Sequence, residues 1–381
     1  MKMISNDNKS PASSRGAYIA RGVSATKDEV HAAIKTQAAG AFPGAFCKII
    51  DDPCGDADYC AAMHADGAGT KSALAYIKYR ETGDASAFFG IAQDSAVMNL
   101  DDLLCIGAAG GFVMSNTIGR NAHRVGGDAI AAIIDGYKTF TDKMRAYGVD
   151  IVMSGGETAD VGDLVGTLIA DSTFFVRLRR RDVLDCSNIK SGDVIVGFAS
   201  FGKAVYEDKY NAGMGSNGLT AARHLLLCSE YADKYPETYS STIEKSMVYS
   251  GRYRFADMLP GADISVGDAI LSPTRTYAPI IKRLLGSRGL HAMVHCTGGG
   301  QVKCRSFGNG LHYIKDNLFD TPPLFYAIGE SGEIDEREMY QVFNMGHRME
   351  LYCTEEFAKT AIDTAAAFGV EGRIVGRVET S

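Results

Sequence analysis

The chain reads His64-Ala65-Asp66-Gly67-Ala68-Gly69-Thr70-Lys71 and, further along, Ser154-Gly155-Gly156-Glu157-Thr158-Ala159-Asp160. Apolar residues that can form a strand precede each stretch, and each stretch combines glycines with a carboxylate. Glycines let the backbone approach a phosphate, and a neighbouring carboxylate supplies an oxygen ligand for Mg²⁺. The two stretches therefore predict turns that bind a nucleoside triphosphate.

The first of these turns is not a P-loop. That motif places its Gly-Lys pair further from the first glycine, whereas one residue separates Gly67 from Gly69 and Thr70 stands before Lys71. A different phosphate-binding architecture is required. The alternative for this turn alone is a tight turn at Asp66-Gly67 followed by a solvated Lys71.

Composition excludes several classes of protein. The chain has 381 residues, 46% hydrophobic and 22% charged, which is ordinary globular usage and long enough for two domains. A net charge of −7 argues against nucleic acid as a partner, because cationic side chains supply most duplex affinity. Nine scattered cysteines without a C-x-x-C pair favour free thiols in a reducing cytoplasm. Residues 1–16 are polar, so we expect a disordered tail and neither a signal peptide nor a membrane anchor.

Hydrophobic periodicity predicts two successive α/β units. In the first, residues 128–148 carry an apolar helical stripe, residues 151–153 resemble a short buried strand, and residues 164–178 alternate as a long strand. In the second, we expect strands at 194–199, 291–296, 348–353 and 373–378 and helices at 217–228, 277–285 and 355–368. The boundary falls near residue 180, which gives an N-terminal domain of residues 17–180 and a C-terminal domain of residues 181–381. The cleft between them is the expected active site.

Residues 90–104 form a predicted helix that carries Asp94, Asp101 and Asp102. Like charges at near-helical spacing repel each other and weaken the helix by a few tenths of a kcal/mol per pair. An Mg²⁺ partner would explain their presence. The alternative is a solvated acidic face.

Three loops of the second half are candidate substrate sites. Ser216-Asn217-Gly218 begins a predicted helix, whose N–H groups and dipole suit a phosphate, although Ser216 would also serve as a simple N-cap. Thr297 with Gly298, Gly299 and Gly300 offers a second nest of N–H groups after a strand, or a close backbone crossing. Arg275 can bind phosphate or carboxylate with its guanidinium, or form a structural ion pair. No histidine stands at a spacing from a serine or cysteine that indicates a nucleophile with its base. The glycine loops, the carboxylates and the lysine instead favour phosphoryl transfer by positioning and charge neutralisation.

Taken together, the motifs resemble aminoimidazole ribonucleotide synthetase, also called phosphoribosylformylglycinamidine cyclo-ligase. The resemblance runs in order along most of the chain and is most specific at residues 338–346 (Glu-Met-Tyr-Gln-Val-Phe-Asn-Met-Gly). Its other segments are residues 18–23, 66–71, 90–103, 155–159, 216–218, 273–277 and 297–300. Asp-Gly-x-Gly-Thr-Lys and Gly-Gly-Glu-Thr are shared with other ATP-using relatives.

The resemblance implies a fold and a reaction. The N-terminal α/β domain would pair across a homodimer to form a β-barrel with ATP near the interface, and the C-terminal α/β domain would complete the substrate cleft. The enzyme would use ATP to phosphorylate the formyl amide oxygen of a small-molecule ribonucleotide, formylglycinamidine ribonucleotide, so that the imidazole ring can close.

The resemblance also implies roles for residues. Lys71 and Asp94 would be catalytic, and Asn344 would lie near the substrate. ATP would bind at Asp66, Gly67, Gly69, Thr70, Lys71, Gly155, Gly156 and Glu157. Mg²⁺ would bind at Asp66, Asp94, Asp102 and Glu157. Substrate would bind at Ser216, Asn217, Gly218, Arg275, Thr297, Gly298, Gly299, Gly300 and Asn344.

Three departures separate this chain from the family pattern. Asp101-Asp102 stands where Asn-Asp is common, the loop after Ala159 is shortened, and Gly215 replaces a histidine before Ser-Asn-Gly. His224 and His295 are candidates for the role of that imidazole. The departures keep two alternatives open, which are another ATP-dependent phosphorylating enzyme of the superfamily and a catalytically silent nucleotide-binding homodimer.

Overall fold

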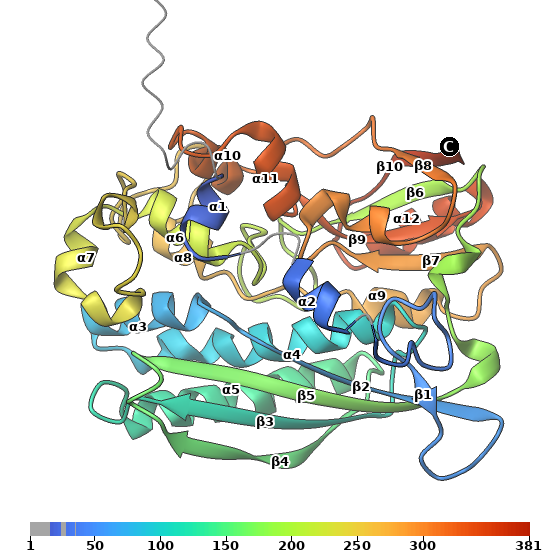
Figure 1. Ribbon diagram of the computed structural model, residues 1–381, viewed down its shortest axis with the longest axis horizontal. Coiled ribbons are helices and arrows are strands. Elements are labelled where there is room, and N and C mark those ends of the chain that lie inside the picture. The colour runs from blue at the N-terminus through green and yellow to red at the C-terminus, as the bar shows by residue number, and fades with distance from the viewer. Residues whose placement is uncertain (1–15, 24–27, 35) are drawn as a thin grey trace, which may run out of the picture.

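The computed structural model describes residues 16–23, 28–34 and 36–381, and these form two α/β domains, each built on one five-stranded sheet. The predicted α/β class and two-domain organisation are confirmed. Figure 1 shows the helix α4 between the first sheet and the second domain. The predicted disordered tail lies, apart from Gly16, outside the described residues.

The first sheet has the order β1-β2-β5-β3-β4, in which only β3 and β4 run parallel. Helices α3, α4 and α5 belong to the same domain, and α5 confirms the predicted helix at 128–148. The elements are β1 (Ile50–Asp51), β2 (Tyr59–Gly67), α3 (Lys71–Thr82), α4 (Phe89–Leu104), β3 (Phe112–Arg120), α5 (Gly127–Ala146), β4 (Ile151–Asp160) and β5 (Leu168–Arg179).

One face of this sheet is packed against helices and the other is open. Along β5, Phe174, Val176 and Leu178 are buried, as their alternation predicts, while the residues between them are more exposed. A row of four apolar residues in mutual register crosses the open face from strand to strand: Met63, Phe175, Val113 and Val152. Three of these residues are exposed by 39% or more, so this face presents apolar surface to its surroundings.

The Gly-Gly-Glu stretch is not a turn after a short buried strand. β4 continues through it to Asp160, and most of the strand is exposed. Gly155 has φ +104° beside a register shift between Met114 and Asn116 of β3, which marks a β-bulge. The glycine absorbs the bulge, so the strand passes through a sequence that is typical of a turn.

The second sheet has the order β7-β9-β6-β10-β8 and is antiparallel throughout. Its strands are β6 (Val194–Ala199), β7 (Leu290–His295), β8 (Leu311–Ile314), β9 (His347–Cys353) and β10 (Gly372–Thr380). The helices of this half are α6 (Leu219–Leu226), α7 (Glu230–Lys234), α8 (Val266–Ile270), α9 (Ala278–Leu284), α10 (Pro323–Gly329), α11 (Glu336–Val342) and α12 (Glu355–Ala367). Short 3-10 turns are η2 (Ala85–Phe88), η3 (Arg180–Asp182), η4 (Cys186–Asn188), η5 (Pro236–Thr238), η6 (Lys245–Met247) and η7 (Gly300–Ser306). Thr354 caps α12 by accepting a hydrogen bond from the Phe357 N–H, and the helix confirms the one predicted at 355–368.

Helix α6 begins later than predicted. Its N-cap is Gly218 at φ +77°, and no side chain caps it. Gly218 must be glycine because a Cβ there would lie 2.5 Å from the Phe343 ring. The Ser216 hydroxyl does not cap the helix and is used elsewhere.

The first helices, α1 (Ala17–Ala20) and α2 (Asp28–Ile34), precede the first sheet in the chain. α1 packs on the second domain, because Glu338 accepts hydrogen bonds from the N–H groups of Ala17 and Tyr18 and Arg21 pairs with Glu333 at 2.6 Å. Residues 17–21, which the predicted boundary assigns to the N-terminal domain, thus contact the C-terminal domain. No helix in the described ranges is long and apolar enough to span a bilayer.

Candidate active site

The two predicted ligand loops from different domains meet at the domain interface. Thr70, at the N-terminus of α3, has its hydroxyl 3.2 Å from the hydroxyl of Thr220 on α6. Thr70 is the N-cap of α3 and its side chain makes no capping hydrogen bond. The N–H groups of Lys71 and Ala73 already donate to the carbonyls of Ala68 and Thr70, so an anion at this helix terminus would be bound by the other N–H groups of the turn.

Glycine is required for different physical reasons at different positions of the two motifs. A Cβ on Gly67 would lie 1.7 Å from the Asp171 carboxylate, and one on Gly156 would lie 2.5 Å from the Asn116 amide. These two glycines accommodate side chains of their own sheet. Gly69, at φ +58°, has open space beyond it, and it is the glycine of the first motif that suits a close phosphate.

Lys71 is fully buried and its ammonium is already used. It donates to Asp94 Oδ1 at 2.6 Å, to the Ser272 carbonyl at 2.5 Å and to the Gly215 carbonyl at 3.2 Å. Burial lowers the pKa of Lys71, and the Asp94 charge opposes that shift. The role predicted for Lys71, which was to counter phosphate charge, is therefore corrected, because its three donors bind the protein.

Asp94 is held in the same way. Its Oδ1 accepts from Lys71, from the Thr274 N–H at 2.7 Å and from the Ser216 hydroxyl at 3.3 Å. The second oxygen, Oδ2, is buried without a partner among the described residues. The contact with Ser216 joins the first domain to the predicted substrate loop.

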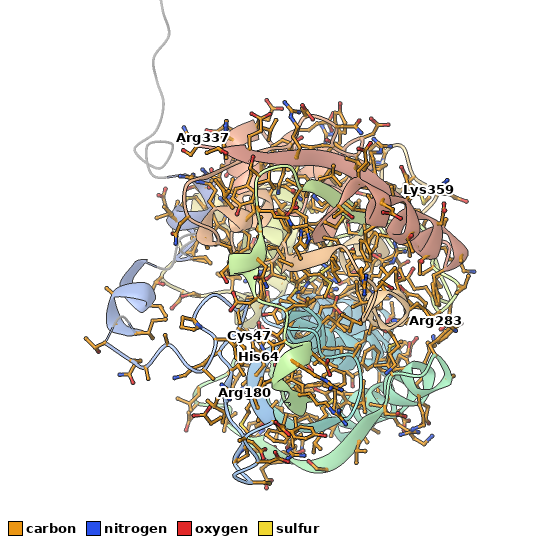
Figure 2. The ribbon with its side chains drawn as sticks, turned by 90° about the vertical axis from the view of Figure 1, so that its right-hand side faces the viewer. Cys47, His64, Arg180, Arg283, Arg337 and Lys359 are labelled. Atoms are coloured by element: carbon orange, nitrogen blue, oxygen red, sulfur yellow. The ribbon has the colours of Figure 1, made fainter. Side chains whose placement is uncertain are left out.

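Asp102 lies between two imidazoles. His64 Nε2 is 3.1 Å from one carboxylate oxygen and His295 Nδ1 is 2.6 Å from the other. Burial lowers the pKa of His64, but the hydrogen bond and charge of Asp102 outweigh burial and raise it to about 9. Figure 2 shows His64 on β2 between the first sheet and the second domain.

The four carboxylates predicted to bind Mg²⁺ do not fit one ion in a single chain. Asp94 and Asp102 are two turns apart on α4, about 12 Å along its axis, and both are paired with protein cations. Asp66 on β2 and Glu157 on β4 are separated by β5 and β3, about 14 Å. Their register also places the two side chains on opposite faces of the sheet. Glu157 pairs with Thr117, Thr117 pairs with Asp171, and Asp171 pairs with Gly67. Asp66 is the neighbour of Gly67 in β2, so its side chain points to the other face. Only Asp66 lies both exposed and beside the α3 terminus.

Several predicted substrate residues hold the protein together instead. Arg275 forms a bidentate pair with Glu207 at 2.9 and 2.5 Å, the structural alternative considered above. Asn344 donates to the carbonyls of Gly213 and Met214 and accepts from Ser200. Both side chains are buried, so we correct their assignment to substrate contact.

The loop of residues 216–218 lies against the glycine loop of residues 297–300. Asn217 donates to the Val342 carbonyl at 2.7 Å and to the Thr297 carbonyl at 3.3 Å. Ser216 is half-buried, and Gly298 has nothing near the position of a Cβ. The structure thus brings the loop of residues 216–218 against the glycine loop, while Thr70 contacts Thr220 of the helix that follows residue 218.

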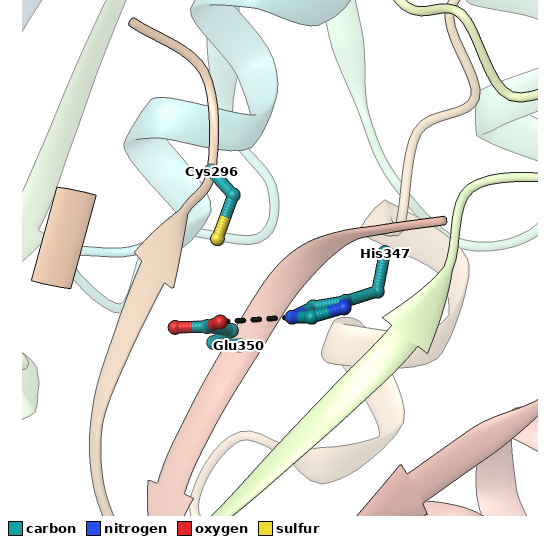
Figure 3. A group of neighbouring side chains, drawn as sticks. All are labelled: Cys296, His347 and Glu350. Carbon is teal, nitrogen blue, oxygen red and sulfur yellow. Dashed lines mark hydrogen bonds and ion pairs between the residues drawn. The ribbon is translucent and has the colours of Figure 1, made fainter. Parts of the chain in front are cut away.

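A buried polar cluster in the second domain was missed by sequence reasoning. The ligand atoms of Cys296, His347 and Glu350 lie within 4.8 Å of one another (Figure 3). Glu350 accepts from His347 at 2.8 Å, from Tyr352 at 2.6 Å and from the Lys315 ammonium. Burial favours a higher pKa for Glu350, but Lys315 and His347 outweigh it and hold the pKa below its usual range. The cluster is a satisfied ion-pair network of the second sheet.

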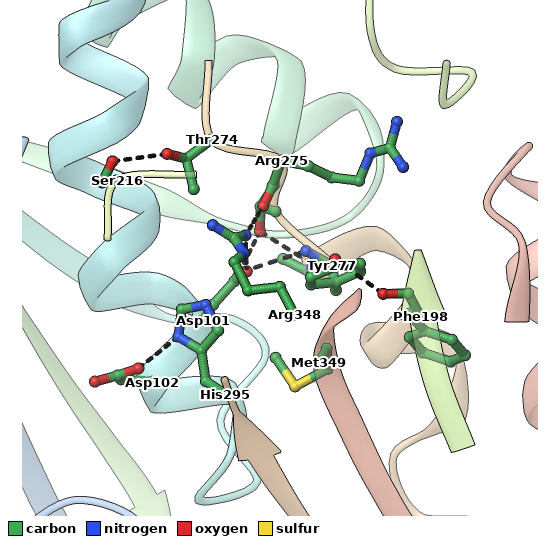
Figure 4. A network of polar contacts seen from close by, with 12 residues as sticks. Asp101, Asp102, Phe198, Ser216, Thr274, Arg275, Tyr277, His295, Arg348 and Met349 are labelled. Carbon is green, nitrogen blue, oxygen red and sulfur yellow. Dashed lines mark hydrogen bonds and ion pairs between the residues drawn. The ribbon is translucent and has the colours of Figure 1, made fainter. Parts of the chain in front are cut away.

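A second missed residue is Arg348 on β9. Its Nη2 lies 3.3 Å from Asp101 Oδ2 and also donates to the Arg275 carbonyl (Figure 4). Asp101 is fully buried and accepts from Thr276 at 2.6 Å as well. A buried aspartate requires a cation nearby. The need of Asp101 for such a partner is the feature of the sequence that could have indicated Arg348.

His224 is not a substitute for the histidine absent at residue 215. It is fully buried, and its Nδ1 accepts from the Tyr249 N–H. Burial, with Arg223 adding to it, lowers the pKa of His224. His295 is committed to Asp102, so neither histidine fills the place beside Gly215.

Known proteins match both domains. The chain matches the N-terminal domain of AIR synthase related proteins over residues 46–174 and the C-terminal domain over residues 190–381. Phosphoribosylformylglycinamidine cyclo-ligase of Methanococcus vannielii is 24% identical over 327 residues, covering 84% of this chain and 78% of the relative. The chloroplastic/mitochondrial cyclo-ligase of Vigna unguiculata is 29% identical over 317 residues, covering 82% and 69%.

A solved structure supports the fold. T. maritima PurL complexed with AMPPCP has a TM-score of 0.50 at 15% identity, over 97% of this chain and 46% of that one. This chain therefore spans less than half of PurL. The two matched domains together cover most of the chain, and the chain belongs to the family of AIR synthase related proteins.

Proposed function

We propose that the protein catalyses the ATP-dependent cyclisation of formylglycinamidine ribonucleotide to aminoimidazole ribonucleotide, a step of purine biosynthesis. The relatives that match most of this chain are named as this ligase. The observation that carries the proposal is the meeting of Thr70 with Thr220, which sets the predicted nucleotide turn against the predicted substrate loop.

The chemistry requires positioning more than a nucleophile. An amide oxygen is a poor leaving group, and phosphorylation converts it to one that departs as phosphate. The amidine nitrogen is tethered in the same molecule, so ring closure needs little further ordering. Backbone N–H groups at α3 and the glycine loop suit the charge that develops on the phosphoryl oxygens.

ATP is the proposed co-substrate, with its phosphates at Gly69, Thr70 and the first turn of α3. The complex of PurL with AMPPCP supports a nucleotide site in this fold. We propose that Mg²⁺ enters with the nucleotide and that Asp66 is the chain's nearest exposed carboxylate. Asp94 and Asp102 are assigned to holding the domain interface.

The proposed substrate side comprises Ser216, Gly218, Thr297 and residues 298–300.

The proposed assembly is a homodimer in the cytoplasm, formed through the open face of the first sheet. The row of Met63, Phe175, Val113 and Val152 supports this choice, because apolar residues in register form a surface suited to a second sheet.

The test is turnover by the purified protein. It should release ADP from Mg-ATP only with formylglycinamidine ribonucleotide present, and aminoimidazole ribonucleotide should appear in equal amount. Asp66→Ala should weaken Mg-ATP binding and abolish turnover. No product at saturating enzyme would reject the proposal.

One observation favours a second candidate, a phosphorylating enzyme of the same superfamily with another acceptor. Asp101, which stands where asparagine is common in the family, pairs with Arg348, and Gly215 stands where the family has a histidine, so the residues beside the substrate loop depart from the family pattern. A screen of phosphate-bearing acceptors for ADP release separates the two candidates. Only the phosphorylating enzyme with another acceptor would turn over ATP without the purine intermediate.

A further inference from the structure

A cavity of about 460 Å³ lies at the junction of the two domains. Helices α4 and α5 of the first domain form one wall, and the segments of residues 206–211 and 271–273 of the second domain form another. The residues proposed above for ATP and substrate do not line it. Its volume falls within the range of about 300–1,000 Å³ that is typical of small-molecule sites.

The cavity has an apolar, aromatic lining. Phe140 and Met144 of α5 and Tyr206 line it and are buried. Phe89 of the first domain and Tyr210 of the second also line it, and each of these two residues is 41% exposed. Exposed rings in a cavity offer flat apolar surface on which another ring can pack. The lining therefore favours a ligand with a planar ring.

Two ion pairs join the domains beside the cavity. Lys78 on α3 lies 2.5 Å from Asp268 on α8, and Lys143 on α5 lies 3.0 Å from Asp208. Figure 1 shows α8 above α3 at this junction. All four side chains line the cavity, so these charges are already paired within the protein.

The remaining charges of the lining also balance. Arg275 holds Glu207 at 2.5 Å, which leaves Lys209 and Asp263 as one charge of each sign. A binding surface favours a charged ligand when charge of the opposite sign is in excess. The described residues around this cavity carry no such excess. The ligand that fits is a planar ring without net charge.

The cavity adjoins the ion pair of Lys71 and Asp94. Ser272 and Pro273 line the cavity, and the Ser272 carbonyl also accepts from the Lys71 ammonium. The next residue, Thr274, donates its N–H to Asp94. The cavity is thus a neighbour of the proposed cleft that uses different residues.

We propose that this cavity is a second small-molecule site, which takes an uncharged planar heterocycle whose ring packs against Phe89 and Tyr210. The site goes beyond the proposed reaction, because neither ATP nor the ribonucleotide occupies it.

The test is the binding of indole-3-acetamide to the full-length protein by calorimetry. Indole-3-acetate and tryptamine are the matched probes that carry a negative or a positive charge on the same ring. We expect the neutral probe to bind severalfold more tightly than either charged probe, and saturating Mg-ATP to leave its affinity unchanged. Tighter binding of a charged probe, displacement by Mg-ATP, or no binding of the neutral probe would overturn the proposal.

Two variants locate the bound probe. Thr139→Phe, at an exposed position of α5 that lines the cavity, fills it and should weaken binding at least tenfold. Ala131→Phe, at an exposed position of the same helix outside the lining, is its control. Tyr210→Ala removes one ring and should weaken binding severalfold, whereas Tyr326→Ala, 65% exposed and outside the lining, should bind like the parent protein.

All four positions are exposed, so the variants should melt near the parent protein. Unchanged affinity in both Thr139→Phe and Tyr210→Ala would place the probe elsewhere and reject the site. The binding measurements do not depend on turnover of the purine intermediate. The proposed function can therefore fail while this site stands, and the reverse.

Discussion

The ammonium of Lys71 and the carboxylate of Asp94 form an ion pair that water does not reach. Each charge is tolerable only because the other is present, together with the backbone groups of Ser272 and Thr274. The pair fixes the start of α3 against α4. The pair thereby holds in place the helix terminus at which we propose that phosphate binds.

Removing one member of the pair should therefore destabilise the protein strongly. Lys71→Met leaves the Asp94 charge buried and should cost about 3–5 kcal/mol of unfolding free energy. The double variant Lys71→Met/Asp94→Leu should lose less than the sum of the two single variants. Denaturant unfolding of all four proteins measures the coupling, and additive losses would contradict the buried pair.

The pKa of about 9 at His64 makes stability depend on pH. Because the folded pKa is raised above the ordinary value near 6.5, the contribution is complete below pH ~6.5 and is lost as pH rises through about 9. The loss should reach about 3 kcal/mol. Unfolding free energies at both ends of this range, for the parent protein and His64→Gln, give the measurement. A difference between the two proteins that does not change with pH would count against the pairing with Asp102.

At the scale of elements, the close approach of Gly218 to Phe343 controls where α6 begins. Gly218→Ala forces alanine into a positive φ and brings its Cβ against the Phe343 ring. The substitution should therefore lower the free energy of unfolding by more than the roughly 1–3 kcal/mol typical of backbone strain alone. Gly192→Ala is the matched control, because Gly192 has φ +92° and nothing near its Cβ position. Equal losses in denaturant unfolding would show that the contact with Phe343 carries no cost.

The elements that the sequence predicts well are those whose signal is local. α5 and β5 carry long periodic patterns, and Thr354 caps α12 by bonding a residue three positions away. The path of β4 through Gly155 depends on a bulge against β3, and the start of α6 depends on Phe343, far along the chain. Contacts between distant segments leave no local pattern, so these two elements required the structure.

The same reasoning applies to the site. The sequence identified Thr70 and Ser216 because both lie in glycine-rich motifs, and Ser216 also stands at the start of a predicted helix. It did not identify the cations that hold the carboxylates, because His64, His295 and Arg348 approach α4 from three separate strands or strand ends. The four predicted metal carboxylates do not meet in one chain, because Asp94 and Asp102 lie two turns apart on α4 and because the order of strands, which separates Asp66 from Glu157, is not visible in the sequence.

At the scale of the whole molecule, the open face of the first sheet predicts self-association. Val152→Lys places a charge in the apolar row and should convert dimers to monomers in analytical ultracentrifugation, since a buried unpaired charge is strongly unfavourable. Ile134→Lys, also at an exposed apolar position but on α5, should leave the assembly unchanged. A monomeric parent protein, or dissociation by both variants, would contradict the proposed interface.

The most direct test of the proposed reaction follows the oxygen atom of the formyl group. Formylglycinamidine ribonucleotide labelled with ¹⁸O at that position is incubated with the protein and Mg-ATP, and the phosphate released is examined by ³¹P NMR. We expect one labelled oxygen in each phosphate formed, together with aminoimidazole ribonucleotide and ADP. Label appearing in water, or phosphate released without label or ring closure, would contradict it.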